Sequence, residues 1–136
     1  MDRYWEQVAD RVVASLGDRL GEIGPARIRD VVDALVAALE ADRALLRVIH
    51  EELPPRRLRH QRRALEQRVR ELATAAMAVQ VPEHERPGVA VKAWVVVLAI
   101  ENLTMRWVLD EPDLERDRLL DEVTAMIAGY LPVSAV

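Results

Sequence analysis

Histidine, serine and carboxylate side chains are the groups in this chain that could support catalysis or hold a metal ion. The three histidines, His50, His60 and His84, lie at least ten residues apart, whereas zinc sites pair their ligands about two to five residues apart. Ser15 and Ser134 have no base near them in sequence, and no two carboxylates have a spacing that indicates acid and base roles. We therefore predict no metal site and no enzymatic activity.

Motifs for cofactors and thiol chemistry are also missing from the sequence. The five glycines are scattered and form no Gly-rich loop between a strand and a helix, as phosphate or dinucleotide binding would require. Cysteine is absent, which excludes disulfides, thiolate metal ligands and cysteine nucleophiles. We expect no cofactor.

Two polar residues end the most apolar segment of the chain. Residues 94–100 (WVVVLAI) are followed at once by Glu101 and Asn102. On a helix with about 100° per residue, Glu101 lies between Trp94 and Val97, which points it inward. Because a buried carboxylate must be paired or protonated, Glu101 is either an anchor in a ligand cavity or part of an internal ion pair with an arginine. Asn102 is expected to form an internal or cross-interface hydrogen bond, with ligand contact as the alternative.

One cluster of arginines stands out in a chain that is otherwise acidic. Its members are Arg56, Arg57, Arg59, Arg62, Arg63, Arg68 and Arg70, with His60 among them and Glu66 as the only acid. A nucleic-acid surface would need interleaved aromatic residues and no opposing overall charge, but the chain has 23 acidic and 19 basic residues and a net charge of −4. We therefore expect a solvated helix face that pairs with acids elsewhere.

The elements that must position these residues are all helices. Ala, Leu, Arg and Glu dominate, and apolar residues recur at intervals of three and four. Asp2, Pro25 and Asp42 are start signals, and the pair at 54–55 is a stop signal. The predicted helices cover about residues 2–20, 25–39, 43–53, 56–79, 89–110 and 114–131. The fold class is therefore an all-α bundle of about six helices that forms one domain over residues 1–136.

The fifth predicted helix is apolar on two opposite sides. One side carries Val91, Trp94, Val95, Leu98, Asn102, Met105 and Leu109; the other carries Val89, Ala93, Val96, Val97, Ile100, Leu103, Thr104 and Trp107. A helix that is apolar nearly all round needs its own core on one side and another partner on the other. We expect that partner to be a second subunit, with a four-helix interface built from the last two helices; the alternative is that both helices are central in a monomer. The predicted interface residues are Val96, Ile100, Leu103, Trp107, Leu119, Val123, Met126 and Ile127.

Two segments resemble a known family: RRALEQRVRELATAAM (62–77) and VVVLAIENLTMRWVLDEPDLERDRLLDEVTAMIAGYL (95–131). With the order of the helices, they are similar to the C-terminal half of tetracycline-repressor (TetR) family transcription regulators, over about residues 2–131. The resemblance implies a homodimer that binds a small-molecule effector among its helices. The chain departs from the family in lacking the N-terminal helix-turn-helix, so DNA is expected to bind only through a domain absent from this chain.

The resemblance also implies a ligand cavity among the first, second, fourth and fifth helices. Its expected ligand-binding residues are Trp94, Leu98, Glu101, Met105 and Met77. Because the chain has three Trp, two Tyr and no Phe, a mostly aliphatic wall would favour a hydrophobic or amphipathic effector. The alternative is a stand-alone helical homodimer with a filled core and no ligand.

The expected location is the cytoplasm of a bacterium. No basic start followed by an apolar stretch indicates a signal peptide. Lys92 and Glu101 interrupt the longest apolar run, which is short of the roughly 20 residues of a membrane span. Eighteen of the nineteen basic residues are Arg, with abundant Ala and Val, as a GC-rich bacterial genome would encode.

Overall fold

The structure, a computed structural model, describes residues 2–16, 24–52, 54–78 and 81–131. They form six α-helices and one short 3-10 helix, with no strand among these residues. The elements are α1 (Asp2–Leu16), α2 (Pro25–Ala41), α3 (Arg43–Glu52), α4 (Pro55–Ala78), η1 (Glu83–Glu85), α5 (Arg86–Asp110) and α6 (Arg116–Tyr130). The predicted all-α fold is confirmed. Of the positions discussed above, residues 17–20, 53, 79 and 134 lie outside the described part, as do the side chains of Asp2, Ser15 and Arg62.

Local signals explain most of the helix ends. Pro25 lies in the first turn of α2, where a missing N–H removes no hydrogen bond. The carboxylate of Asp42 accepts a hydrogen bond from the backbone N–H of Leu45 at 3.3 Å and so caps α3, as predicted. α5 begins at Arg86, earlier than expected, because Pro87 is likewise accommodated in the first turn of a helix.

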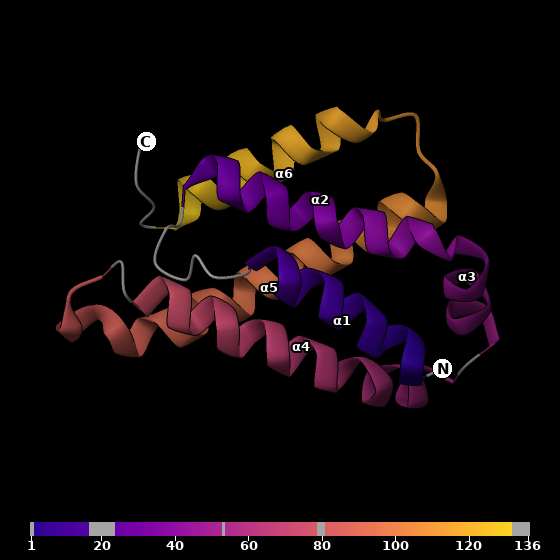
Figure 1. The fold of residues 1–136 in the computed structure, drawn as a ribbon, viewed down its shortest axis with the longest axis horizontal. Helices are drawn as coiled ribbons and strands as arrows, with labels where there is room; N and C mark the ends of the chain where they lie inside the picture. The colour runs from indigo at the N-terminus through magenta and orange to yellow at the C-terminus, as the bar shows by residue number, and fades with distance from the viewer. Residues whose placement is uncertain (1, 17–23, 53, 79–80, 132–136) are drawn as a thin grey trace.

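The helices form two layers that pack on each other through α1 and α2 and share α5. In Figure 1, α2 and α6 run along the upper edge of the molecule and α1 and α4 along the lower edge, with α5 behind them. α3 closes the end at which α1 begins, and the described chain ends at the opposite end. α5 packs against both α2 and α4, so this helix is the common wall of the two layers.

Two apolar clusters fill the interior. The first core cluster includes Val32, Val36, Met77, Val89, Ala93, Val96, Leu120, Val123 and Ile127. The second core cluster consists of Tyr4, Val8, Ala38, Leu39, Leu46, Ile49, Met105 and Val108. Trp107 of α5 packs against both clusters, and its ring N–H donates a hydrogen bond to the carbonyl oxygen of Leu114 at 2.8 Å. This tryptophan therefore connects the two parts of the core.

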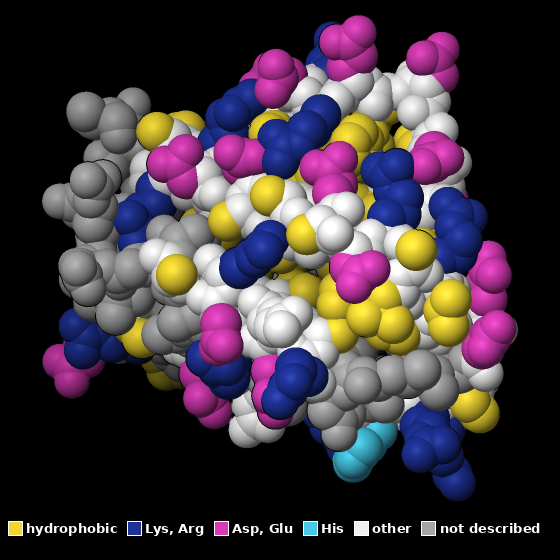
Figure 2. Space-filling model, turned by 45° about the vertical axis from the view of Figure 1, so that its right-hand side comes forward, with side chains coloured by type: hydrophobic (Ala, Val, Ile, Leu, Met, Phe, Trp, Pro, Cys, Tyr) yellow, Lys and Arg dark blue, Asp and Glu magenta, His cyan; other side chains and the backbone are white. Residues whose placement is uncertain are grey.

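Ion pairs fasten α6 to α2 on the outside. Arg116 Nη2 lies 2.6 Å from Asp33 Oδ1, and its Nε lies 3.0 Å from Glu40 Oε1. Nearer the other end of these helices, Arg29 Nε lies 3.1 Å from Asp121 Oδ1. Figure 2 shows acidic and basic side chains intermingled over the upper part of the molecule, where these helices lie. α2 and α6 are thus held by charge as well as by apolar packing.

Candidate functional site

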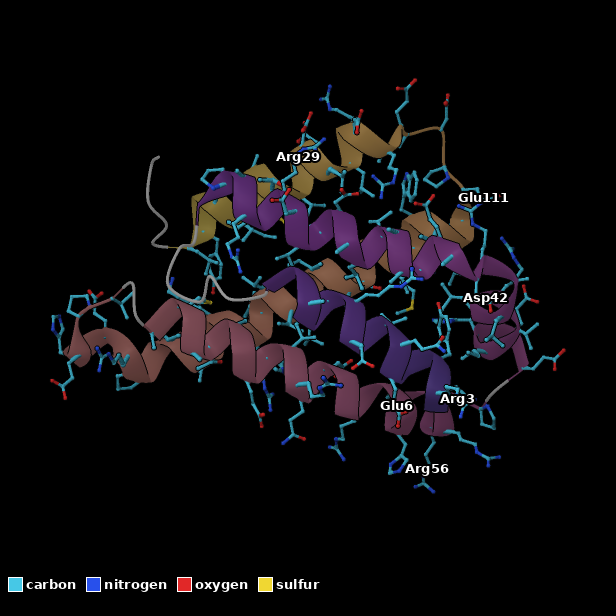
Figure 3. The ribbon with its side chains drawn as sticks, viewed as in Figure 1. Arg3, Glu6, Arg29, Asp42, Arg56 and Glu111 are labelled. Carbon is cyan, nitrogen blue, oxygen red and sulfur yellow. The ribbon has the colours of Figure 1, made fainter. Side chains whose placement is uncertain are left out.

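A pocket opens between α1 and the C-terminal end of α2. It has a volume of about 350 Å³, at the lower end of the roughly 300–1,000 Å³ typical of small-molecule sites. It is lined by Tyr4, Gln7, Val8, Asp10, Arg11, Ala38, Ala41 and Asp42. Figure 3 places Asp42 where α2 ends, next to α3. The pocket therefore lies at the meeting point of three helices.

The base of this pocket is apolar and its rim is polar. Tyr4, Val8 and Ala38 line the pocket and also belong to the second core cluster, which α3 and α5 complete. Gln7, Asp10, Arg11 and Asp42 supply the polar groups of the lining. An apolar base with a few convergent polar groups is the usual composition of a site for a small organic molecule.

The electrostatic environment of the pocket is set by two carboxylates. Burial raises the pKa of the Tyr4 phenol to about 12, and the negative charge of Asp42 adds to the shift. Tyr4 therefore stays neutral at physiological pH. Asp10 lies at the other side of the pocket and is partly neutralised by Arg68 of α4, whose Nη1 lies 3.3 Å from Asp10 Oδ1. The rim can therefore accept hydrogen bonds at its two carboxylates and donate them from Arg11, next to an apolar base.

A second pocket, of about 640 Å³, lies between the start of α5 and the end of α6. Its lining includes Val81, His84, Glu85, Gly88, Val89, Lys92, Tyr130 and Leu131. The ammonium of Lys92 lies over the ring of Tyr130, 4.4 Å from its centre, a cation–π contact that joins the two helices.

The five residues predicted to bind a ligand do not line either described pocket. Met77 is buried in the first core cluster and Met105 in the second. Trp94 is half exposed, at 50%, while Leu98 and Glu101 are half-buried. The pocket residues Tyr4 and Asp42 were not predicted as a site, since the sequence marks Asp42 only as a helix cap and Tyr4 only as one residue of an amphipathic helix.

Within the subunit, the structure buries most of the side of α5 that we expected to meet a second subunit. Val96 is buried in the first core cluster, whereas Val91 and Trp94 are exposed, at 62% and 50%. Of the predicted interface residues, Leu119, Val123 and Ile127 are buried and Ile100 and Trp107 half-buried in the subunit, while Leu103 and Met126 are exposed. The helix wheel could show two apolar sides but not which of them faces the rest of the chain.

Several large apolar residues of α5 and α6 are exposed, and we call this set the outer apolar face. It comprises Val91, Trp94 and Val95 on one side of α5, Leu103 farther round the same helix, and Met126 and Tyr130 on α6. The helical stretch over Glu83–Asp110 is also long and apolar enough to cross a membrane by length and composition, with a mean hydropathy of 1.5, but core helices pass the same test. In an 18-residue stretch of this helix, 33% is buried in the subunit, while Val91, Trp94 and Val95 are exposed.

The remaining candidates for chemistry do not converge. His60 and His84 are exposed and His50 is half-buried on α3. Within the described residues, no group of three or more His, Cys, Asp or Glu side chains could hold a metal ion.

Comparison with known proteins agrees with this description. The family model described as "Tetracyclin repressor-like, C-terminal domain" matches residues 25–131, from the start of α2 to the end of α6. Neither a curated protein nor a solved structure matches the chain. Because the family model covers most of the chain, the chain belongs to the tetracycline-repressor-like C-terminal domain family.

Proposed function

We propose that this chain is the ligand-sensing and dimerisation domain of a TetR-like transcriptional repressor that works in the bacterial cytoplasm. The family match supports a regulatory domain of this type. The observation that carries the dimer is the outer apolar face of α5 and α6. In this proposal DNA is read by a helix-turn-helix in a domain other than this one.

A second copy of the chain is the occupant that best fits the outer apolar face. The face contains Trp, Met and Tyr, residue types that are enriched in protein interfaces. On α6 it adjoins the exposed Ala125 and Gly129, and a Cβ built at Gly129 meets nothing within 4 Å. Two α6 helices related by a two-fold axis can therefore approach closely at these small residues, which gives a self-complementary surface.

Sedimentation equilibrium at micromolar concentration tests the dimer. The wild-type chain should have twice the 15.4 kDa mass of one chain. Val95→Glu should yield the monomer, because dimerisation would then bury an unpaired carboxylate. Val48→Glu is the matched control: Val48 is similarly exposed, at 40% against 38% for Val95, but lies on α3. A monomeric wild type, or equal dissociation by both variants, would refute this interface.

The pocket between α1 and α2 is the proposed effector site. Its apolar base and polar rim fit a small amphipathic molecule with a hydrogen-donating group. A thermal-shift screen of amphipathic amines, fatty acids and drug-like molecules tests it, since a ligand at a hundred times its dissociation constant adds about 2.7 kcal/mol to stability. Ala41→Trp should fill this pocket and abolish the shift, whereas Gly88→Trp, in the second pocket, should preserve it.

If Gly88→Trp abolishes the thermal shift and Ala41→Trp preserves it, the effector site is the second pocket.

The second candidate function is a helical homodimer that acts as an interaction module without a ligand. A chain that sediments as a dimer but shows no thermal shift with any compound would favour the interaction module, because it would dimerise without binding an effector.

A further inference from the structure

The exposed surface of α4 carries a row of arginines that neither the pocket nor the outer apolar face uses. Arg56, Arg59, Arg63 and Arg70 are separated by three, four and seven residues, so their side chains share one face of the helix. All four are exposed. We call this row the arginine stripe; at 1.5 Å per residue it is about 21 Å long. Figure 3 shows Arg56 at the lower edge, directed away from the body of the molecule.

The charge of the chain is strongly segregated around this stripe. Residues 55–70 contain seven arginines and one glutamate. Since the whole chain has a net charge of −4, the rest of the chain carries −10. The molecule therefore combines a cationic helix surface with an anionic remainder, which the net charge of the whole chain does not show.

Among the acids that the structure describes, none forms an ion pair with the arginine stripe. Ion pairs hold Arg29, Arg43, Arg106, Arg116 and Arg118 on the other helices. On α4, Arg68 pairs with Asp10, but no ion pair among the described residues involves any member of the stripe. The expectation that this cluster pairs with acids elsewhere thus holds for Arg68 and not for the stripe.

The neighbouring acids leave the stripe available. Glu66 is half-buried beside it. Glu71 lies one turn beyond Gln67 and accepts a hydrogen bond from the Gln67 side chain at 3.4 Å. No described acid therefore occupies the donors of the four guanidinium groups, which leaves them open to a partner outside the chain.

The composition of this surface favours phosphates over a lipid bilayer or an apolar protein surface. Every exposed side chain described between residues 56 and 71 is polar or charged, so the described part of this surface offers no apolar anchor to insert into lipid or into a pocket on a protein. The guanidinium group is a planar fork of donors that matches the geometry of phosphate oxygens. Along a duplex, about 21 Å spans about six phosphates of each strand.

We infer that the arginine stripe of α4 binds the phosphate backbone of double-stranded nucleic acid without reading or stacking on its bases, so it does not need the interleaved aromatic residues expected above of a nucleic-acid surface. The anionic remainder of the chain keeps this binding weak and confines it to low salt. The contact is separate from the effector pocket and from the dimer interface. It would allow a regulatory domain of this family to add sequence-independent affinity on its own surface.

Fluorescence anisotropy of a labelled duplex of arbitrary sequence, titrated with the full chain, tests this inference. Four phosphate contacts should give a slope of log affinity against log salt of about −3.6. A change from about 20 to about 200 mM NaCl should therefore weaken binding about 4,000-fold. The double variant Arg59→Gln/Arg63→Gln should reduce the slope to about −1.8, because it removes two contacts.

The double variant Arg86→Gln/Arg118→Gln is the matched control, since it removes the same charge from α5 and α6. It should leave the slope unchanged. Absence of binding at about 20 mM NaCl, or the same change of slope in both double variants, would overturn the inference. Equally tight binding to polyglutamate would also overturn it, in favour of an acidic protein partner.

Discussion

The buried phenol of Tyr4 should make the stability of the domain fall in alkaline solution. Tyr4 is 5% exposed, and its pKa is raised from 10.0 to about 12 by burial and by the charge of Asp42. Between these two pH values the unfolded chain releases the phenolic proton and the folded chain keeps it. The stabilisation is therefore complete below about pH 10 and is lost as the pH rises towards about 12.

The size of this loss follows from the two pKa values. With pKa values of 10 and about 12, the contribution falls by about 1.4 kcal/mol at pH 11 and by about 2.7 kcal/mol at full ionisation. Urea unfolding followed by circular dichroism at about pH 8 and about pH 11 measures the loss. Tyr4→Phe should lose about 1.4 kcal/mol less than the wild type over this interval. Tyr130→Phe, which alters an exposed tyrosine, should behave like the wild type. An equal alkaline loss in Tyr4→Phe and the wild type would refute the reasoning.

Two further predictions concern the ends of α5 and α6. Arg116→Met should lower the free energy of unfolding by about 1–2 kcal/mol, and by less at high salt, because Asp33 and Glu40 would both lose their ion pair with Arg116. Urea unfolding at two ionic strengths measures both effects, and an unchanged unfolding midpoint would contradict them. Glu111 has a left-handed backbone, with φ of 48°, and its carboxylate lies 2.6 Å from Arg43 Nη1. Glu111→Gly should therefore be about 1 kcal/mol more stable than Glu111→Ala, since both lose the ion pair and only alanine keeps the strain; equal thermal midpoints would count against this account.

The ends of the helices can be predicted because their signals are local. A proline fixes its own φ and lacks an N–H wherever it occurs, so Pro25 marks the start of α2 without knowledge of the fold. Asp42 caps α3 through an N–H three residues away. The start of α5 lies earlier than the sequence predicts, because Pro87 is typical of a loop although the first turn of a helix also accepts it.

The orientation of α5 could not be predicted, because it depends on contacts that are distant in sequence. A helix wheel places Val96 and Trp94 on two equally apolar sides. In the structure, Val96 lies in the core cluster that includes α2 and α6, whereas Trp94 is exposed to solvent. The pocket could not be predicted for the same reason. Tyr4 lies on α1 and Asp42 between α2 and α3, and no sequence pattern in either segment indicates that the two residues meet. The arginine cluster is visible in the sequence, but only the structure separates Arg68, which is paired, from the stripe.

The arrangement around α5 gives the proposed effector site a physical route to the proposed dimer interface. Met105 and Val108 of α5 belong to the cluster beneath the pocket, while Trp94 and Leu103 lie on the outer apolar face of the same helix. Trp107 of the same helix packs against both core clusters. Its ring N–H also donates a hydrogen bond to Leu114, in the segment that leads into α6. An effector that shifts α5 at the base of the pocket must therefore also change the surface presented to the second subunit. Because linkage is reciprocal, dimerisation would then change effector affinity by the same factor as the effector changes dimer affinity.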